Sequence, residues 1–167
     1  SALESLWALH LVGGLTDEVA ASMLKHEDQF VRAWTVRLLC DDYSVEPQIA
    51  RALSELAGHE SYLSVRGQLA SSAKRLPAKD ALPIIRNLLK YDEDSQDIFQ
   101  PLLIWWALES KATGEGRDLI LSLVLNDKEV WDRPLVKEHL TERLMKRYAL
   151  AGSREELMAA AKLLQQA

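Results

Sequence analysis

Two rows of side chains in this 167-residue sequence combine residue types that could bind a ligand. The first row contains Trp7, Trp34, Gln68, Trp106 and His139, and the second contains His10, Arg37, Ser71, Glu109 and Glu142. Each member of the second row follows its partner by three residues, a spacing that places both on one face of an α-helix. Aromatic rings beside polar groups on an accessible face suit the binding of a peptide or a sugar-like ligand. These ten residues are called the stripe below, and we expect them to line a concave surface.

A structural interpretation of the same tryptophans stays open beside the binding one. The chain has five tryptophans, and tryptophans in an all-α array are often core residues. Each ring would then pack against the next helix and show only its edge. The sequence does not decide between a binding stripe and an aromatic core.

Histidines and acids in the chain lack the spacing of a metal site. The four histidines are far apart, and no two of them are four residues apart on one helix, as a helical metal site requires. The acidic run Asp92-Glu93-Asp94 lacks the alternating ligands and the central glycine of an EF-hand loop. We therefore predict no bound metal and a solvated turn at residues 92–94.

Cys40 is the single cysteine, so the chain cannot form an internal disulfide. The sequence has no Cys-x-x-Cys pair for zinc and no Cys-x-x-Cys-His for haem attachment. The negative charges of Asp41 and Asp42 would disfavour a thiolate at Cys40. We predict a small core residue there rather than a nucleophile, and no cofactor.

Composition and charge restrict the class of protein. Hydrophobic residues make up 48% of the chain, which excludes disorder, and only 7 glycines and 5 prolines interrupt its helix-forming stretches. A net charge of −5 makes strong binding to nucleic acid or anionic membranes unexpected. No apolar run is long enough to span a membrane. The composition predicts an all-α protein without membrane insertion.

A segment that recurs after 34 residues indicates how the helices are organised. Val31-Arg32-Ala33-Trp34 and Val65-Arg66-Gly67-Gln68 each open an apolar helical run and follow a short turn containing acids. A period of this length on a helix-turn-helix unit is typical of an α-solenoid, in which neighbouring repeats must stack to bury their apolar faces. We expect one domain over residues 1–167, built as a right-handed α-α superhelix of about ten helices in antiparallel pairs.

Capping residues and prolines set the expected helix limits. Thr16 and Ser153 have N-cap character, and Pro47 and Pro101 suit first helical turns. Pro77 is expected to close a helix, and the glycine-containing segment 113–116 is expected to be a loop. The expected helices cover residues 2–12, 17–26, 28–41, 47–57, a partner helix ending before Pro77, 80–91, 98–111, 117–125, a helix from 131 or 134 to 150, and 154–164.

The unit of first helix, acidic turn, Val-Arg and second helix resembles a HEAT repeat. Asp28-Gln29-Phe30-Val31-Arg32 is the best copy. In HEAT proteins the acid and the arginine commonly form a ladder of contacts between adjacent repeats. The resemblance therefore implies that Arg32 and Arg66, with Asp28 and Glu60, form a ladder that fixes register, which we favour over an anion site.

A narrower resemblance rests on LWALH at residues 6–10, VRAWTVRLL at 31–39, VRGQLA at 65–70 and PLLIWWALE at 101–109. In order and spacing these are similar to the helical segment of planctomycete-type membrane-bound dehydrogenases or haem-binding proteins. That family places the segment between a β-propeller and a c-type cytochrome domain, in a secreted or periplasmic protein. The resemblance implies a spacer or docking array that belongs to a larger protein, with no redox residue of its own.

Two function classes follow. The first is a non-catalytic interaction or spacer module whose partner is a protein or a neighbouring domain of the same chain. The second is an enzyme resembling HEAT-like alkylpurine DNA glycosylases, with Trp105, Trp106 and Glu109 in a concave cleft. The negative charge argues against nucleic acid and hence favours the module. Leu3, Leu6 and Leu9 lie on a helix without a first-helix partner, so we also expect weak self-association through the N-terminal end.

Overall fold

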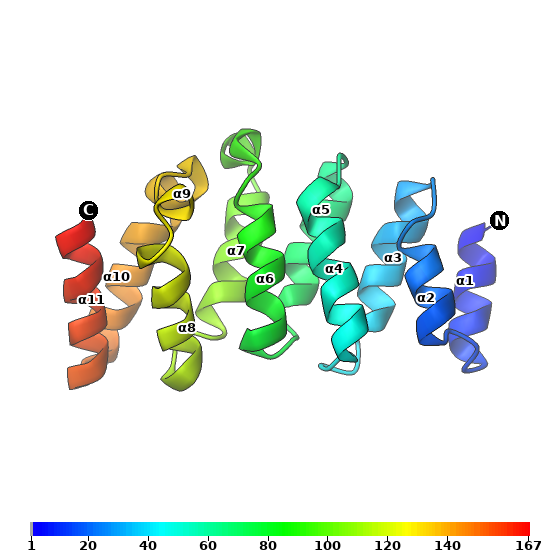
Figure 1. The fold of residues 1–167 in the computed structure, drawn as a ribbon, viewed down its shortest axis with the longest axis horizontal. Helices are drawn as coiled ribbons and strands as arrows, with labels where there is room; N and C mark the ends of the chain where they lie inside the picture. Colours follow the sequence, from blue (N-terminus) through cyan, green and yellow to red (C-terminus); the bar gives the residue numbers. More distant parts are fainter. Residues whose placement is uncertain (1) are drawn as a thin grey trace.

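The computed structural model describes residues 2–167 and is built from helices, with no β-strand in that part of the chain (Figure 1). The α-helices are α1 (Ala2–Leu11), α2 (Asp17–Met23), α3 (Gln29–Leu39), α4 (Pro47–His59), α5 (Leu63–Ala73), α6 (Ala78–Leu88), α7 (Gln100–Glu109), α8 (Gly114–Leu125), α9 (Lys128–Trp131), α10 (Thr141–Ala151) and α11 (Arg154–Gln166). A 3-10 turn, η1 (Asp92–Gln96), and a π-helical segment, η2 (Leu135–Leu140), complete the list. The predicted all-α class is confirmed.

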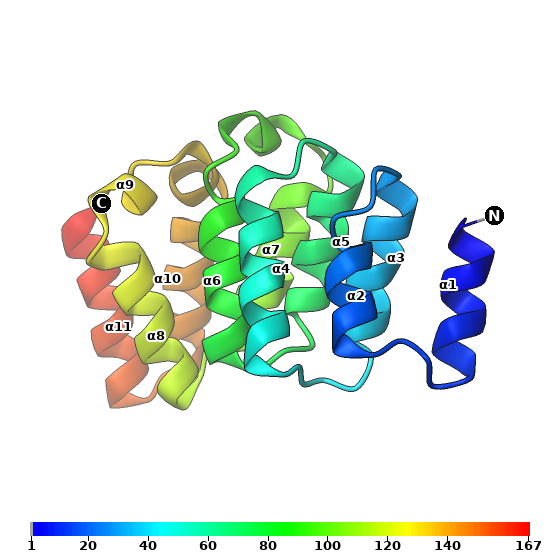
Figure 2. The same cartoon turned by 45° about the vertical axis from the view of Figure 1, so that its right-hand side comes forward.

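The helices form two layers that run in chain order from one end of the molecule to the other (Figures 1 and 2). One layer contains α2, α4, α6, α8 and α11, and the other contains α1, α3, α5, α7 and α10. Neighbouring helices pack against one another within each layer, and the two layers contact each other through pairs such as α2 with α3, α5 with α6, and α10 with α11. The two chain ends consequently lie at opposite ends of the array.

The core lies between the two layers. Leu53, Leu69, Ile85 and Leu108 are fully buried there and belong to one apolar cluster that extends along the array. Small buried residues, such as Ala70, allow neighbouring helices to approach closely. Because each layer covers the apolar side of the other, the outward side of each helix is left for polar or functional residues.

Side-chain caps fix several helix starts where the sequence predicted them. Thr16 Oγ1 accepts a hydrogen bond from the Val19 amide, and Ser153 Oγ accepts one from the Glu156 amide. Pro47 and Pro101 both lie in first turns, where a missing N–H has no cost. The capping predictions are therefore confirmed.

Several helix limits differ from expectation by a few residues, and two differ in kind. Helix α5 ends at Ala73, so Pro77 is the N-cap of α6 instead of the end of α5. The segment expected as a loop forms the first turn of α8, which begins at Gly114 in a left-handed conformation with φ of 52°. Gly116 is needed in that turn because a Cβ there would overlap the carbonyl oxygen of Lys111.

The helix expected to begin at 131 or 134 is divided into α9, η2 and α10. Pro134 follows α9 and cannot continue its hydrogen bonds. In η2 the Thr141 hydroxyl donates to the carbonyl of Val136, five residues earlier, which suits the wider π-helical turn.

The N-terminal helix also differs in detail. Leu6 is buried at 1% exposure, because α1 packs its Leu6 side toward α3. Leu3 is half-buried, whereas Leu9 is exposed as expected, together with Trp7, Leu11 and Val12.

Candidate binding surface and arginine ladder

Two arginines link successive turns through bidentate ion pairs. Arg32 donates from Nε to Glu60 Oε2 at 2.8 Å and from Nη2 to Glu60 Oε1 at 2.8 Å. Arg66 binds both carboxylate oxygens of Asp94 in the same way, with Nε to Oδ2 at 2.8 Å. Each acid lies 28 residues after its arginine, in the turn of the following repeat. These two pairs form the ladder.

The remaining arginine donor of each pair binds the turn before its own helix. Arg32 Nη1 donates to the carbonyls of His26 and Glu27 at 2.7 and 2.9 Å. Arg66 Nη1 donates to the carbonyls of Glu60 and Ser61 at 3.1 and 3.0 Å. Each arginine therefore connects its own turn to the next one.

The environment of Glu60 shows why this arrangement is stable. Burial acts to raise the pKa of Glu60, but hydrogen bonds from Arg32 and from the Tyr62 amide outweigh it, so the pKa lies below its ordinary value. Glu60 remains charged although only 3% of it is exposed. Because both arginine forks are occupied by carboxylates, Arg32 and Arg66 form no anion site, and the ladder prediction is confirmed.

The pairing within the ladder differs from expectation in two places. Asp28 caps α3 by accepting a hydrogen bond from the Phe30 amide at 2.8 Å and takes no part in the ladder. Asp92 and Glu93 are exposed but Asp94 is only 2% exposed, so the prediction of a solvated turn at residues 92–94 is wrong for Asp94. The sequence signal that identifies Asp94 is its 28-residue distance from Arg66, which equals the distance between Arg32 and Glu60.

The ten stripe residues lie on α1, α3, α5, α7 and the η2–α10 segment, and none of them is buried. Trp7 is 37% exposed and Trp106 is 46% exposed, while Trp34, Gln68 and His139 are half-buried. The second-row residues His10, Arg37, Ser71, Glu109 and Glu142 are all exposed. The tryptophans that pack in the core are Trp105 and Trp131 instead.

Aromatic side chains gather at the N-terminal half of the stripe. The rings of Trp7 and Trp34 meet edge to face, with 5.0 Å between centroids and an interplanar angle of 79°. The Arg37 guanidinium lies 5.1 Å from the centroid of Trp34. Phe30, one turn before Trp34 on the same face of α3, is 59% exposed. We call Trp7, Phe30, Trp34 and Arg37 the aromatic patch. The sequence analysis did not single out Phe30, although its four-residue distance from Trp34 places it on the same face of α3.

The rest of the stripe is polar and is partly engaged within the chain. Gln68 Nε2 donates to Ser72 Oγ at 2.9 Å, so a polar segment separates Trp34 from Trp106. His139 Nε2 lies 2.8 Å from the carbonyl oxygen of Ser95 in η1. Glu142 pairs with Lys146 one turn later. The structure therefore joins the residues of the aromatic patch but does not extend that patch along the whole stripe.

Candidate metal ligands and the single cysteine are placed as follows. Residues 2–167 contain no cluster of three or more histidine, cysteine or acidic side chains that could hold a metal ion. Cys40 is fully buried, and burial is the main cause that raises its pKa to about 12, with Asp41 a lesser one. Cys40 is therefore a small core residue, as predicted, and its burial raises the pKa of the thiol more than the neighbouring charges do.

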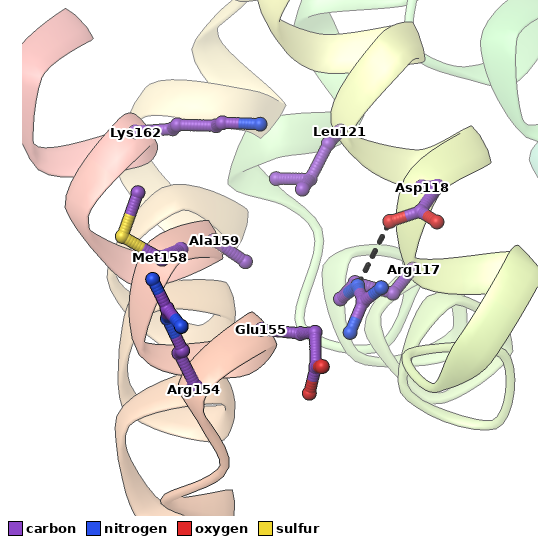
Figure 3. Close-up of a pocket in the computed structure, with 8 residues that line it drawn as sticks. All are labelled: Arg117, Asp118, Leu121, Arg154, Glu155, Met158, Ala159 and Lys162. Atoms are coloured by element: carbon purple, nitrogen blue, oxygen red, sulfur yellow. Dashed lines mark hydrogen bonds and ion pairs between the residues drawn. The ribbon is translucent and has the colours of Figure 1, made fainter.

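A groove of about 360 Å³ lies between α8 and α11, away from the stripe. Figure 3 shows Arg117, Asp118 and Leu121 on the α8 side, facing residues of α11 that include Arg154, Glu155 and Lys162. Arg117 Nε donates to Asp118 at 2.8 Å. Both walls mix acids and bases, so the groove offers no selective charge to a ligand.

Comparison with protein-family models finds no match, and searches of curated proteins and of solved structures find none either. Among the helices of residues 2–167, none has the length and apolar character needed to cross a membrane.

Proposed function

We propose that this chain is a non-catalytic, HEAT-like interaction module that recognises a protein segment through the aromatic patch. The observation that carries the proposal is the contact between the exposed Trp7 and the half-buried Trp34, with Arg37 over the Trp34 ring and the exposed Phe30 one turn earlier on α3. Tryptophan and arginine are enriched among residues that dominate binding energy at protein interfaces. A rigid layer of stacked helices holds these side chains without further ordering cost.

The HEAT-like assignment is part of the same proposal. The paired helices in two layers support it, and so does the recurrence of arginine–acid contacts at 28-residue spacing. The proposed partner is another protein or a neighbouring domain of the same chain. A spacer or docking role in a secreted or periplasmic dehydrogenase-type protein agrees with the sequence resemblance.

The glycosylase-like alternative has less support. Trp105 is 9% exposed and has Arg143 near its ring, so only Trp106 could stack on a nucleobase beside Glu109. The cleft would also have to attract phosphates to a chain of net charge −5. A titration with duplex DNA at physiological salt separates the two proposals, because the module should not bind measurably.

The test uses peptides selected from a random library against the wild-type chain. Trp34→Ala should weaken their binding by about 2 kcal/mol, roughly 30-fold, as loss of an aromatic anchor does. Glu55→Ala is the matched control, because Glu55 is exposed on α4 in the other layer. Peptides that bind wild type and Trp34→Ala equally well would contradict the proposed site.

Stability measurements distinguish recognition from packing at Trp34. If the Trp34 ring is half-buried, Trp34→Ala should lower the unfolding free energy by less than a core truncation does. If the ring is wedged between helices, the same change should lower it by about 3–5 kcal/mol. Trp105→Ala provides the core reference within the same chain. Arg37→Ala should change the unfolding free energy by no more than about 0.5 kcal/mol, because Arg37 is exposed. Urea denaturation of the three variants gives these values.

A further inference from the structure

A cationic pocket lies at the edge of the array opposite the ladder, where the chain turns after α3, α5 and α7. Its volume is about 420 Å³. Its lining includes the basic side chains Lys74, Arg75 and Lys111 and the hydroxyl-bearing residues Tyr43, Ser110 and Thr113. We call it the basic pocket, and the turns after α3, α5 and α7 that carry its lining residues lie along the lower edge of the ribbon in Figure 1.

Lys111 is the unusual member of this pocket. Only 8% of the residue is exposed, and its ammonium donates to the Lys74 carbonyl and to Ser110 Oγ, both at 3.0 Å. An ammonium has three hydrogens, so one donor remains. No carboxylate within residues 2–167 pairs with Lys111 or with Lys74.

A buried cation without a counter-ion is costly, and this chain avoids that cost elsewhere. The buried arginines, Arg32 and Arg66, each have a carboxylate in bidentate contact. Arg75, at the rim of the basic pocket, pairs with Asp41 and lies over the Tyr43 ring. Lys111 and Lys74 thus leave two positive charges unbalanced around one pocket.

The start of α8 adds to the positive potential. Gly116 allows the first turn of this 12-residue helix to lie directly against the Lys111 carbonyl. The Thr113 side chain makes no capping hydrogen bond, so it does not cover the first-turn amides. A helix N-terminus carries a partial positive charge.

We propose that the basic pocket binds a phosphate-type oxyanion, either free or as the monoester of a small molecule. The third hydrogen of the Lys111 ammonium and the Lys74 ammonium supply two charges that match a dianion. Thr113 offers a hydroxyl donor, whereas the Ser110 hydroxyl already donates to the Ala107 carbonyl at 2.8 Å and serves to hold the Lys111 ammonium. A cavity of about 420 Å³ exceeds the size of one phosphate, so the organic part of a monoester fits beside it.

Protonation of Lys111 provides an internal readout. Burial, with a smaller contribution from Lys74, lowers the pKa of Lys111 to about 8. A bound dianion would favour the charged amine and raise that pKa again. Nuclear magnetic resonance of the Lys111 side chain should therefore detect phosphate directly at this residue.

The experiment titrates the whole chain with inorganic phosphate in phosphate-free buffer at pH 7.5 and constant ionic strength, using calorimetry and side-chain resonances. We expect saturable binding in the millimolar range and a higher Lys111 pKa with phosphate. Lys111→Met and Lys74→Met should each weaken binding by about tenfold or more, the effect of one charge-assisted hydrogen bond. Lys128→Met, at an exposed lysine of α9, is the matched control and should bind as wild type does.

Titration with O-phosphoserine separates the two forms of the ligand. Tighter binding than inorganic phosphate assigns the pocket to monoesters, and equal binding assigns it to the free anion. The proposal is overturned if the wild-type chain shows no saturable binding up to about 20 mM phosphate, a range that includes weak anion sites. The proposal is also overturned if Lys74→Met binds phosphate as tightly as the wild-type chain does. Because Lys74 is exposed, Lys74→Met should fold, and the test therefore stands even if Lys111→Met does not fold.

Discussion

Replacement of Arg66 by methionine gives the most direct test of the ladder. Methionine keeps an apolar stem of similar length but removes the guanidinium that binds Asp94 and the carbonyls of Glu60 and Ser61. The Asp94 carboxylate, 2% exposed, would then lose its arginine partner in a site that water hardly reaches. Two turn carbonyls would lose their donor as well.

The expected cost is about 3–5 kcal/mol, the usual effect of removing one partner from a buried ion pair. Since domains of this size are stable by about 5–15 kcal/mol, this is a large part of the total. Urea denaturation followed by circular dichroism at pH 7 measures it, and an unchanged m-value would show that the transition remains comparable.

A second substitution separates the charge penalty from lost packing. In Arg66→Met/Asp94→Leu the unpaired carboxylate is gone, so most of the lost stability should return. The reasoning is refuted if Arg66→Met costs less than about 1 kcal/mol, or if the double variant is as unstable as the single one.

Three further predictions concern glycine packing, protonation and thiol reactivity. Gly116→Ala should lower the unfolding free energy by about 1–3 kcal/mol, because the new Cβ would overlap a backbone carbonyl. Gly67→Ala should raise the unfolding free energy by about 0.5–1 kcal/mol, because its Cβ would make only ordinary contacts. Thermal denaturation of the two variants compares these effects. The pKa of Lys111 is lowered to about 8 from an ordinary value of 10.5, so between these values the folded state binds fewer protons than the unfolded state. The unfolding free energy of the wild-type chain, relative to that of Lys111→Met, should therefore rise by up to about 3 kcal/mol from pH 8 to 10.5 in phosphate-free buffer. Urea titrations that show no rise over this range would contradict the lowered pKa of Lys111. Cys40 should resist iodoacetamide at pH 8 until urea unfolds the chain, as mass spectrometry would show; rapid native alkylation would contradict its burial.

Local sequence patterns were sufficient for the helical class and for several helix starts. Thr16 and Ser153 act within their own first turns, so neighbouring residues alone determine their role. The facing of Trp34 and Arg37 was also predictable, because three-residue spacing fixes the side of a helix. The burial of Asp94 was not, since it depends on an arginine 28 residues earlier.

The two neighbouring tryptophans of α7 were separated only by one of the two sequence interpretations. Trp105 and Trp106 are adjacent on α7, yet one is buried and the other is exposed. Of this pair, the stripe included Trp106 alone, because adjacent residues lie on different faces of a helix, whereas the glycosylase-like alternative placed both rings in one cleft. The irregular segment after Trp131 was not predicted, because Pro134 ends one helix while packing restarts another.

Each rung of the ladder follows one rule of position. The arginine binds the carbonyls six and five residues before it and the acid 28 residues after it, at both Arg32 and Arg66. If 34 residues were deleted so that Arg66 took the place of Arg32, the guanidinium would still face two turn carbonyls and one carboxylate. A deletion that moved Glu60 or Asp94 out of reach of its arginine would leave a largely buried charge without its partner. The ion pairs therefore favour the gain or loss of whole 34-residue units over partial ones.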